Sequence, residues 1–288
     1  MLLESGWRKM YLNRTCFLKM LEYVREPVER GIRKILSDKE ALEREKFPSS
    51  PLKLIVEAIV TRSWWRYWPW DKLVEALRKR GYSKWDGDSP KIGIEDLAFI
   101  SDTLDYLYNT SGTSLWKEAT DSIRFLEVKL KEIGSLKAWI SKIYEVVKEQ
   151  RPDWREHEYI KGIKGLGAKG VHDILRSFGY FDMAPIDIHE RRFLLRTGIL
   201  LRYGPSSGDP QDLEFYLEAL RKFCKEELRG IKILGQDLGD APGIVDMIIW
   251  HFCCTGWKGC KGICSADPRC EICPIKDCCL YYRLRGSK

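Results

Sequence analysis

Residues 159–200, YIKGIKGLGAKGVHDILRSFGYFDMAPIDIHERRFLLRTGIL, predict two short helices joined by a glycine hairpin, followed by a buried aspartate that precedes a third helix. The two glycines of the hairpin, residues 163–167, let the backbone turn sharply and approach a partner closely. The amides beyond it open a new helix, whose N-terminus carries unpaired N–H groups and partial positive charge. Such a hairpin binds a phosphate without reading sequence. The candidate contact residues are Lys164, Gly165, Leu166 and Gly167. A lone Gly-x-Gly equally suits a plain helix–turn–helix corner.

Two side chains with useful chemistry follow the hairpin. Lys169 is the second residue after the last hairpin glycine, and Asp187 lies 18 positions further on. Each also has a purely structural interpretation. Asp187 precedes the apolar stretch 188–200 and has Glu190 three residues on, which is the pattern of an N-cap in a capping box. Lys169 suits a simple phosphate contact. The spacing of the pair is what favours a functional site.

The chain resembles the endonuclease III superfamily of DNA glycosylases, whose signature is a helix-hairpin-helix, a Gly/Pro-rich loop and a catalytic aspartate. Residues 163–169, IKGLGAK, match the family's Leu-Pro-Gly-Val-Gly-x-Lys, and residues 186–189, IDIH, match its Val-Asp-Thr-His. The departures are Lys164, where the family has proline, and Gly170, where it has threonine. Neither departure removes a group that does chemistry.

The resemblance implies that Lys169 and Asp187 are catalytic. A glycosidic bond breaks through an oxocarbenium-like state that a nearby carboxylate stabilises, and a neutral amine then captures C1′. The resulting Schiff base allows β-elimination, so the expected protein is a bifunctional DNA glycosylase/AP lyase acting on double-stranded DNA. Lysine titrates at about 10.4. We therefore expect the helix N-terminus and the neighbouring Lys161 and Lys164 to lower the pKa of Lys169.

Eight of the ten cysteines lie between Cys253 and Cys279, and such crowding indicates metal ligation. Residues 267–279 resemble the end of the family's iron–sulfur loop, Cys-x2-Cys-x5-Cys. The family has six residues between its first and second cluster cysteines, whereas five separate Cys264 from Cys270. The resemblance implies a [4Fe-4S] cluster held by Cys264, Cys270, Cys273 and Cys279, with Cys260 as the substitute for Cys264. Thiolate tetrads also hold zinc, and spacing alone does not separate the two.

A disulfide framework is disfavoured, because the chain has no apolar signal peptide and is too long to depend on such staples. The spare cysteines Cys253, Cys254 and Cys278 are then expected to be buried thiols. The cluster loop would hold Lys258, Lys261, Arg269 and Lys276 against DNA phosphates.

Composition agrees with this interpretation without deciding it. The 49 basic and 42 acidic residues give a net charge of +7, a mild bias towards polyanions. A charged fraction of 32% with few Asn and Gln residues is typical of thermophilic proteins. No apolar run approaches the roughly 20 residues of a membrane span. We therefore expect a soluble, intracellular monomer, cytoplasmic and associated with the nucleoid.

Helical periodicity recurs along the chain without a convincing alternating strand, which predicts an all-α fold. Helices are expected from Ser50–Pro51, over 94–107, over 116–130 ending at Gly134, over 136–147, over 209–228, and from Pro242 into the cysteines. The resemblance implies a six-helix barrel domain, 51–180, ending in the hairpin. Residues 1–50 and 181–288 would form the second helical domain with the cluster loop. Lys169 and Asp187 would then face each other across the interdomain cleft.

The base to be removed is the least determined point. Relatives of endonuclease III carry a glutamine-bearing segment after the first barrel helix, and here Arg62 takes that place, followed by Trp64 and further aromatic residues. We expect Arg62 and Trp64 to contact DNA, because aromatic rings stack on flipped or estranged bases; packing in the core explains them equally well.

The main expectation is endonuclease III-like removal of oxidised pyrimidines. The alternative is a glycosylase for oxidised (8-oxo) or mispaired guanine, since the segment around Arg62 departs from the pyrimidine-lesion pattern. A monofunctional glycosylase, or a DNA-binding module without catalysis, would retain the same hairpin.

Overall fold

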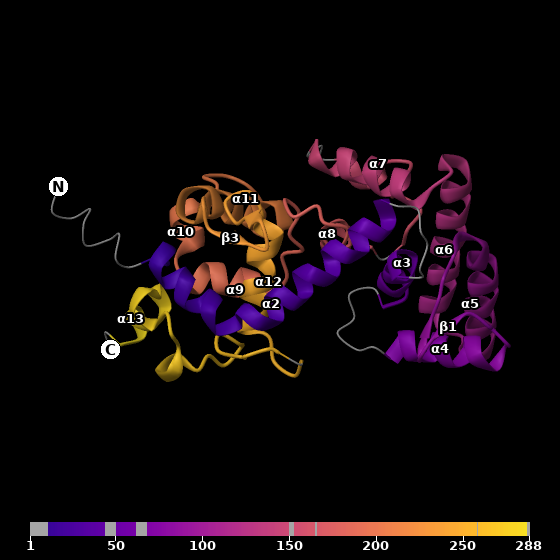
Figure 1. The fold of residues 1–288 in the computed structure, drawn as a ribbon, viewed down its shortest axis with the longest axis horizontal. Helices are drawn as coiled ribbons and strands as arrows, with labels where there is room; N and C mark the ends of the chain where they lie inside the picture. The colour runs from indigo at the N-terminus through magenta and orange to yellow at the C-terminus, as the bar shows by residue number, and fades with distance from the viewer. Residues whose placement is uncertain are drawn as a thin grey trace. The chain divides into compact units, whose positions relative to one another are not determined.

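The computed structural model describes residues 11–43, 50–61, 68–149, 153–164, 166–257 and 259–286. Its regular structure is almost entirely helical (Figure 1), which confirms the all-α prediction. Contacts divide the chain into two compact units: Leu36–Gly179, here called the hairpin unit, and Met1–Ile35 with Tyr180–Lys288, here called the terminal unit. One boundary adjoins the expected one at 180, and the other lies within the long helix α2, Arg14–Glu43. The domain division at 51 and 180 stays a prediction.

The hairpin unit is built on helices that pack in sequence order. Its elements are α3 (Ser50–Thr61), α4 (Trp68–Lys79), β1 (Trp85–Asp86), β2 (Ser89–Pro90), η1 (Ile94–Asp96), α5 (Leu97–Ser111), α6 (Ser114–Ile133), α7 (Leu136–Lys148), η2 (Trp154–Glu156) and α8 (Ala168–Ser177). Helices α5 and α6 run side by side (Figure 1), and α3 contacts α4, α6 and α8. Trp116 and Trp139, each at most 2% exposed, fill the interior of this unit.

Local signals in the sequence set several of these boundaries. Gly134 adopts φ 88°, the left-handed conformation that glycine tolerates, and its N–H donates to Leu130 O at 2.9 Å. Ser135 then caps α7 by accepting from Ala138 N at 3.1 Å. Both helix boundaries were expected. The helix predicted from Ile94 begins instead with the 3-10 turn η1 before α5.

The terminal unit centres on a buried helix. Its elements after residue 180 are α9 (Ile188–Arg196), α10 (Ile199–Tyr203), α11 (Leu213–Phe223), the π-helical turn η3 (Cys224–Leu228), β3 (Lys232–Ile233), β4 (Gln236–Asp237), α12 (Pro242–Cys253), η4 (Cys270–Ile272), η5 (Lys276–Cys278) and α13 (Leu280–Gly286). Helix α12 is buried over nearly its whole length and packs on α9 and α11 (Figure 1). Its start at Pro242 confirms the prediction.

Two predicted helices are shorter than expected. The helix expected from Ile188 to Leu200 is interrupted at Gly198, which takes φ 77°, so that α9 and α10 are separate. The helix expected from Asp209 begins at Leu213, where Asp212 is the N-cap and accepts from Glu214 N at 3.4 Å. Two short β-hairpins, β1–β2 and β3–β4, also appear where no strand was expected. No helix within the described ranges is both long and apolar enough to cross a lipid bilayer.

Candidate active site

The glycine hairpin is fixed to α6. The N–H of Lys164 donates to Ser122 Oγ at 2.9 Å, and Lys164 Nζ forms an ion pair with Asp121 at 2.9 Å. At Gly162 a Cβ atom would overlap the ring of Phe125, so only glycine fits there without a shift. The segment before the hairpin is not the regular helix expected from the sequence. It is the 3-10 turn η2 followed by successive turns to residue 164.

Lys169 lies in the first turn of α8, as the sequence predicts. Gly167 is the N-cap residue and supplies no side chain to the helix end. Lys169 follows as the second residue of the helix and is half-buried. The neighbouring Gly170 is buried, and a Cβ atom there would lie 2.7 Å from Leu166 Cδ1. A residue with a Cβ atom at 170 would therefore require the flexible end of the Leu166 side chain to move.

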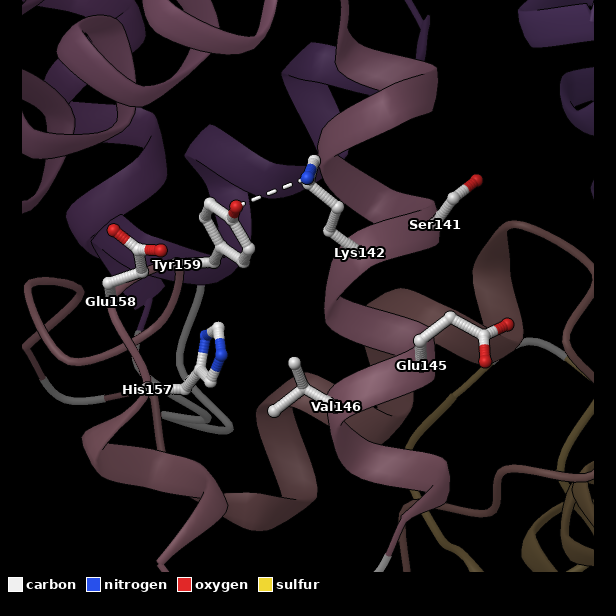
Figure 2. Close-up of a pocket in the computed structure, with 7 residues that line it drawn as sticks. All are labelled: Ser141, Lys142, Glu145, Val146, His157, Glu158 and Tyr159. Carbon is white, nitrogen blue, oxygen red and sulfur yellow. Dashed lines mark hydrogen bonds between the residues drawn. The ribbon is translucent and has the colours of Figure 1, made fainter.

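A pocket of about 370 Å³ lies in the hairpin unit, just before the hairpin (Figure 2). Helix α7 provides one wall and His157, Glu158 and Tyr159 the other. Lys142 Nζ hydrogen-bonds Tyr159 Oη at 3.1 Å and lies 5.0 Å from the centre of its ring. The lining includes the charged side chains of Lys142, Glu145 and Glu158, and the Glu145 carboxylate points away from His157 (Figure 2).

Asp187 is the N-cap of α9, in the terminal unit. Its Oδ1 accepts from His189 N at 2.6 Å, and Glu190 Oε2 accepts from Asp187 N at 2.8 Å, so the two side chains form a capping box. The loop that precedes Asp187 is hydrogen-bonded to α12, because Phe181 O accepts from the N–H of Gly243 at 2.7 Å. The capping role is therefore real, and it orients a half-buried carboxylate on a rigid element.

Behind Asp187 lies a buried acidic pair that the sequence did not reveal. Glu190 is 1% exposed and Asp246, in the middle of α12, is 2% exposed. Burial, the negative charge of Asp246 and the side-chain contact with Asp187 raise the pKa of Glu190 well above its usual value. The only signals in the sequence were one glutamate at the third helical position and one aspartate within an apolar run.

The cysteine tail is held by disulfides and by Arg196. Disulfides join Cys16 to Cys278 and Cys254 to Cys260, with Cα–Cα distances of 6.5 and 5.6 Å. Cys254 and Cys278 were expected to be free thiols, so that prediction is wrong. Arg196 donates to Ser265 O at 2.5 Å and to Ala266 O at 3.0 Å, which ties the loop to the end of α9.

Cys264 is held in place by protein groups. A hydrogen bond from Cys253 and the guanidinium of Arg196, whose Nη1 lies 3.7 Å from Cys264 Sγ, lower the pKa of this thiol to about 7 although burial opposes the change. In the parts of the chain that the structure describes, no group of three or more His, Cys, Asp or Glu side chains is arranged to hold a metal ion. The arrangement thus supports neither iron–sulfur nor zinc ligation by Cys264, Cys270, Cys273 and Cys279. Cys260, the substitute ligand, is used in a disulfide.

Three predicted DNA contacts, Gly165, Arg62 and Trp64, lie outside the described residues, as does Lys258. Of the other loop cations, Arg269 donates to the carbonyls of Gly262 and Lys261 and is used within the loop.

The comparisons with known proteins agree with one another. Residues 89–227 match the Ogg-HhH family, described as 8-oxoguanine DNA glycosylase. A protein of Saccharolobus islandicus strain L.S.2.15 is 29% identical over 134 residues, and one of Saccharolobus solfataricus strain P2 is 28% identical over the same length. Both are named 8-oxoguanine DNA glycosylase/AP lyase. The matched segment covers 44% of this chain and 58% of each relative. No solved structure matches the chain.

These matches correct two expectations and leave others open. Glycosylases of the Ogg type lack an iron–sulfur cluster, so with the absence of a metal-binding group in the described residues the predicted [4Fe-4S] cluster is wrong. The superfamily inferred from the hairpin is consistent with the match, whereas endonuclease III itself is not what these residues match. The thermophilic character stays a prediction. Residues 89–227, which carry the hairpin, Lys169 and Asp187, are similar to the helix-hairpin-helix domain of 8-oxoguanine DNA glycosylases.

Proposed function

We propose that this protein is a bifunctional DNA glycosylase/AP lyase that removes 8-oxoguanine from double-stranded DNA, with Lys169 as nucleophile and Asp187 as the catalytic carboxylate. The observation that carries the proposal is the match of residues 89–227 to 8-oxoguanine DNA glycosylases, because both residues lie inside it. It is supported by the rigid placement of each group, one in the first turn of α8 and the other at the cap of α9.

The proposed reaction begins with the glycosidic bond. The bond between C1′ and the base nitrogen breaks, the base leaves with the electron pair and takes up a proton, and Asp187 stabilises the positive charge on the sugar. Neutral Lys169 Nζ forms a bond to C1′, and the proton it loses passes to Asp187. The sugar ring opens as Asp187 returns that proton to O4′, which leaves a protonated imine between Lys169 and C1′.

The lyase step follows from the imine. Loss of a proton from C2′ drives the electron pair towards C3′, and the C3′–O bond breaks so that the 3′ phosphate leaves. Water then hydrolyses the imine and returns Lys169 as a free amine. No metal or redox partner enters this balance.

The hairpin is proposed to hold the DNA backbone. Gly167 leaves the N-terminus of α8 without a side-chain cap, which suits an approaching phosphate oxygen. Lys164 is paired with Asp121, but both side chains are well exposed, and surface pairs of this kind are worth about 1 kcal/mol or less. A DNA phosphate is therefore able to replace Asp121 as the partner of Lys164.

The preference for 8-oxoguanine over oxidised pyrimidines rests on the named relatives and on the family match. It reverses the order of the two substrate expectations from the sequence. The departure of the Arg62 segment from the pyrimidine-lesion pattern points the same way.

The test is borohydride trapping on duplexes that contain 8-oxoguanine, thymine glycol, uracil, a normal guanine or an abasic site. We expect covalent adducts with 8-oxoguanine and with the abasic site. Lys169→Gln should lose both adducts and the strand cleavage, whereas Lys131→Gln, which removes the charge of an exposed lysine on α6, should retain them.

The outcomes separate the alternatives. Base release without trapping would indicate a monofunctional glycosylase, and adducts with thymine glycol but not 8-oxoguanine would restore the pyrimidine assignment. DNA binding with neither activity would indicate a non-catalytic module. Near-normal base release by Asp187→Asn would reduce Asp187 to a helix cap.

A further inference from the structure

Glu190 is a buried carboxyl group in direct support of Asp187. It occupies the third position of α9, and its side chain points inward, where only 1% of the residue remains exposed. Its Oε2 accepts the N–H of Asp187 at 2.8 Å. In a capping box the third residue of the helix supplies only this one contact, which an exposed glutamate makes as well. The deep burial of Glu190 therefore goes beyond what capping requires.

The second oxygen of Glu190 is in an acidic environment. Among the described residues, no hydrogen-bond donor meets Oε1, which is inaccessible to solvent. The Asp187 carboxyl lies within hydrogen-bonding reach of the Glu190 side chain, and the negative charge of Asp246 acts on it from α12. Two ionised carboxylates offer each other only acceptors, so their contact becomes a hydrogen bond only when one of them carries a proton.

The proton belongs on Glu190 rather than on Asp187. Glu190 is fully buried, so its ionised form is strongly disfavoured, whereas Asp187 is partly exposed to solvent. Asp187 also accepts the backbone N–H of His189 at 2.6 Å, which favours its ionised form. We propose that Glu190 is a positioning residue that carries a proton at neutral pH and donates it in a hydrogen bond to the Asp187 carboxylate.

This inference rests on the proposed function and deepens it. A donor behind Asp187 holds the carboxylate in one orientation and keeps it ionised, as it must be to stabilise a positive sugar and to accept a proton from Lys169. If Glu190 loses its proton at high pH, the hydrogen bond is replaced by repulsion between two carboxylates. The rate of base release is then expected to fall at high pH because Glu190 is deprotonated, and not because of any change in the nucleophile Lys169.

The groups that act on Glu190 come from two helices. On α9 the neighbour is Asp187, and on α12 they are Asp246 and the buried thiol of Cys253, whose own pKa is raised by burial and influenced by Glu190. The largest effects on the pKa of Glu190 are burial, Asp246 and Asp187, and Arg192 on α9 acts on the neighbouring Cys253. Because the thiols also titrate on the alkaline side, only an alkaline loss that disappears in Glu190→Gln is attributed to Glu190.

The experiment compares wild type with Glu190→Gln and Glu190→Leu. Single-turnover release of 8-oxoguanine is measured across pH, with Asp187→Asn as the reference for loss of the carboxylate. The amide of Gln donates a hydrogen bond but does not ionise. We expect Glu190→Gln to be close to wild type at neutral pH and to lack the alkaline fall. Glu190→Leu removes the donor, so its rate should fall about tenfold or more, with the acidic limb moved to higher pH.

A second readout does not depend on activity. Infrared spectra of substrate-free protein at neutral pH should contain the carbonyl stretch of one protonated carboxylic acid that disappears in Glu190→Gln. The proposal is overturned if this band is absent, if wild type and Glu190→Gln share one pH profile, or if Glu190→Gln is as slow as Glu190→Leu. If wild type releases no base from any duplex, the proposed function fails, whereas the infrared band still decides whether Glu190 holds the proton.

Discussion

Replacing Glu190 with Gln is expected to stabilise the protein at neutral pH. Burial and the charge of Asp246 raise the pKa of Glu190 above its usual value of 4.5, which it has in the unfolded chain. Between these two values the folded state binds more protons than the unfolded state. The contribution of Glu190 to the free energy of unfolding therefore falls as pH rises through this window, and this contribution is highest below about pH 4.5. The amide of Gln accepts from Asp187 N–H through its oxygen and donates to the neighbouring carboxylates through its nitrogen, and it does not ionise.

The magnitude follows from the linkage relation. Within the window, the stability of wild type relative to Glu190→Gln declines by about 1.4 kcal/mol per pH unit. For a chain of this size, one kcal/mol changes Tm by about 2–4 °C. The difference in Tm between the variant and wild type should therefore grow by roughly 3–6 °C for each pH unit above 4.5, until the raised pKa is reached.

The assay is thermal unfolding followed by circular dichroism at closely spaced pH values from 4 to 8. The matched control is Glu218→Gln, which changes an exposed glutamate on α11 in the same unit and should give a difference that does not depend on pH. A Tm difference for Glu190→Gln that stays constant over this range, or a variant less stable than wild type at pH 7, would contradict the assignment of a buried neutral Glu190.

Three further results are expected. Cys16→Ser opens a loop closed over 262 positions and should lower the free energy of unfolding by up to about 5 kcal/mol, measured by urea unfolding of the oxidised proteins. In reducing buffer, where wild type also lacks the disulfide, the two unfolding curves should coincide. Gly162→Ala, which places a Cβ atom on the ring of Phe125, should cost about 1–3 kcal/mol and weaken binding to undamaged duplex; unchanged affinity would mean that the hairpin does not hold DNA. Arg196→Gln removes the donor to Cys264 Sγ and should raise the pKa of that thiol above 7, followed by thiolate absorbance during a pH titration.

The elements that the sequence predicted correctly are those whose ends depend on residues close together in the sequence. Gly134 ends a helix and Asp187 begins one because a single residue's conformation or side chain satisfies the helix end. The position of Lys169 in the first turn of α8 follows from the glycines just before it. The segment before the hairpin was harder to predict, since the spacing of its apolar residues suits both a helix and the consecutive turns that are found.

What the sequence missed at the site concerns partners that are distant in the chain. Asp246 acts on Glu190 because α9 packs on α12, and the spacing of residues in either helix does not predict that interaction. The crowded cysteines indicated metal ligation, yet the spacing of cysteines along the sequence does not determine which sulfur atoms lie close together in the fold. Cys278 pairs with Cys16, which lies near the other end of the sequence, and Arg196 rather than a metal ion contacts Cys264.

The bond between Cys16 and Cys278 gives the oxidised protein the covalent topology of a ring with two short tails. A protease that cuts one peptide bond anywhere inside that ring produces no separate fragments, because both pieces remain linked through sulfur. Only a second cut, or reduction of the disulfide, releases them. A singly nicked molecule therefore keeps its full mass on a non-reducing gel and separates into pieces once thiol is added.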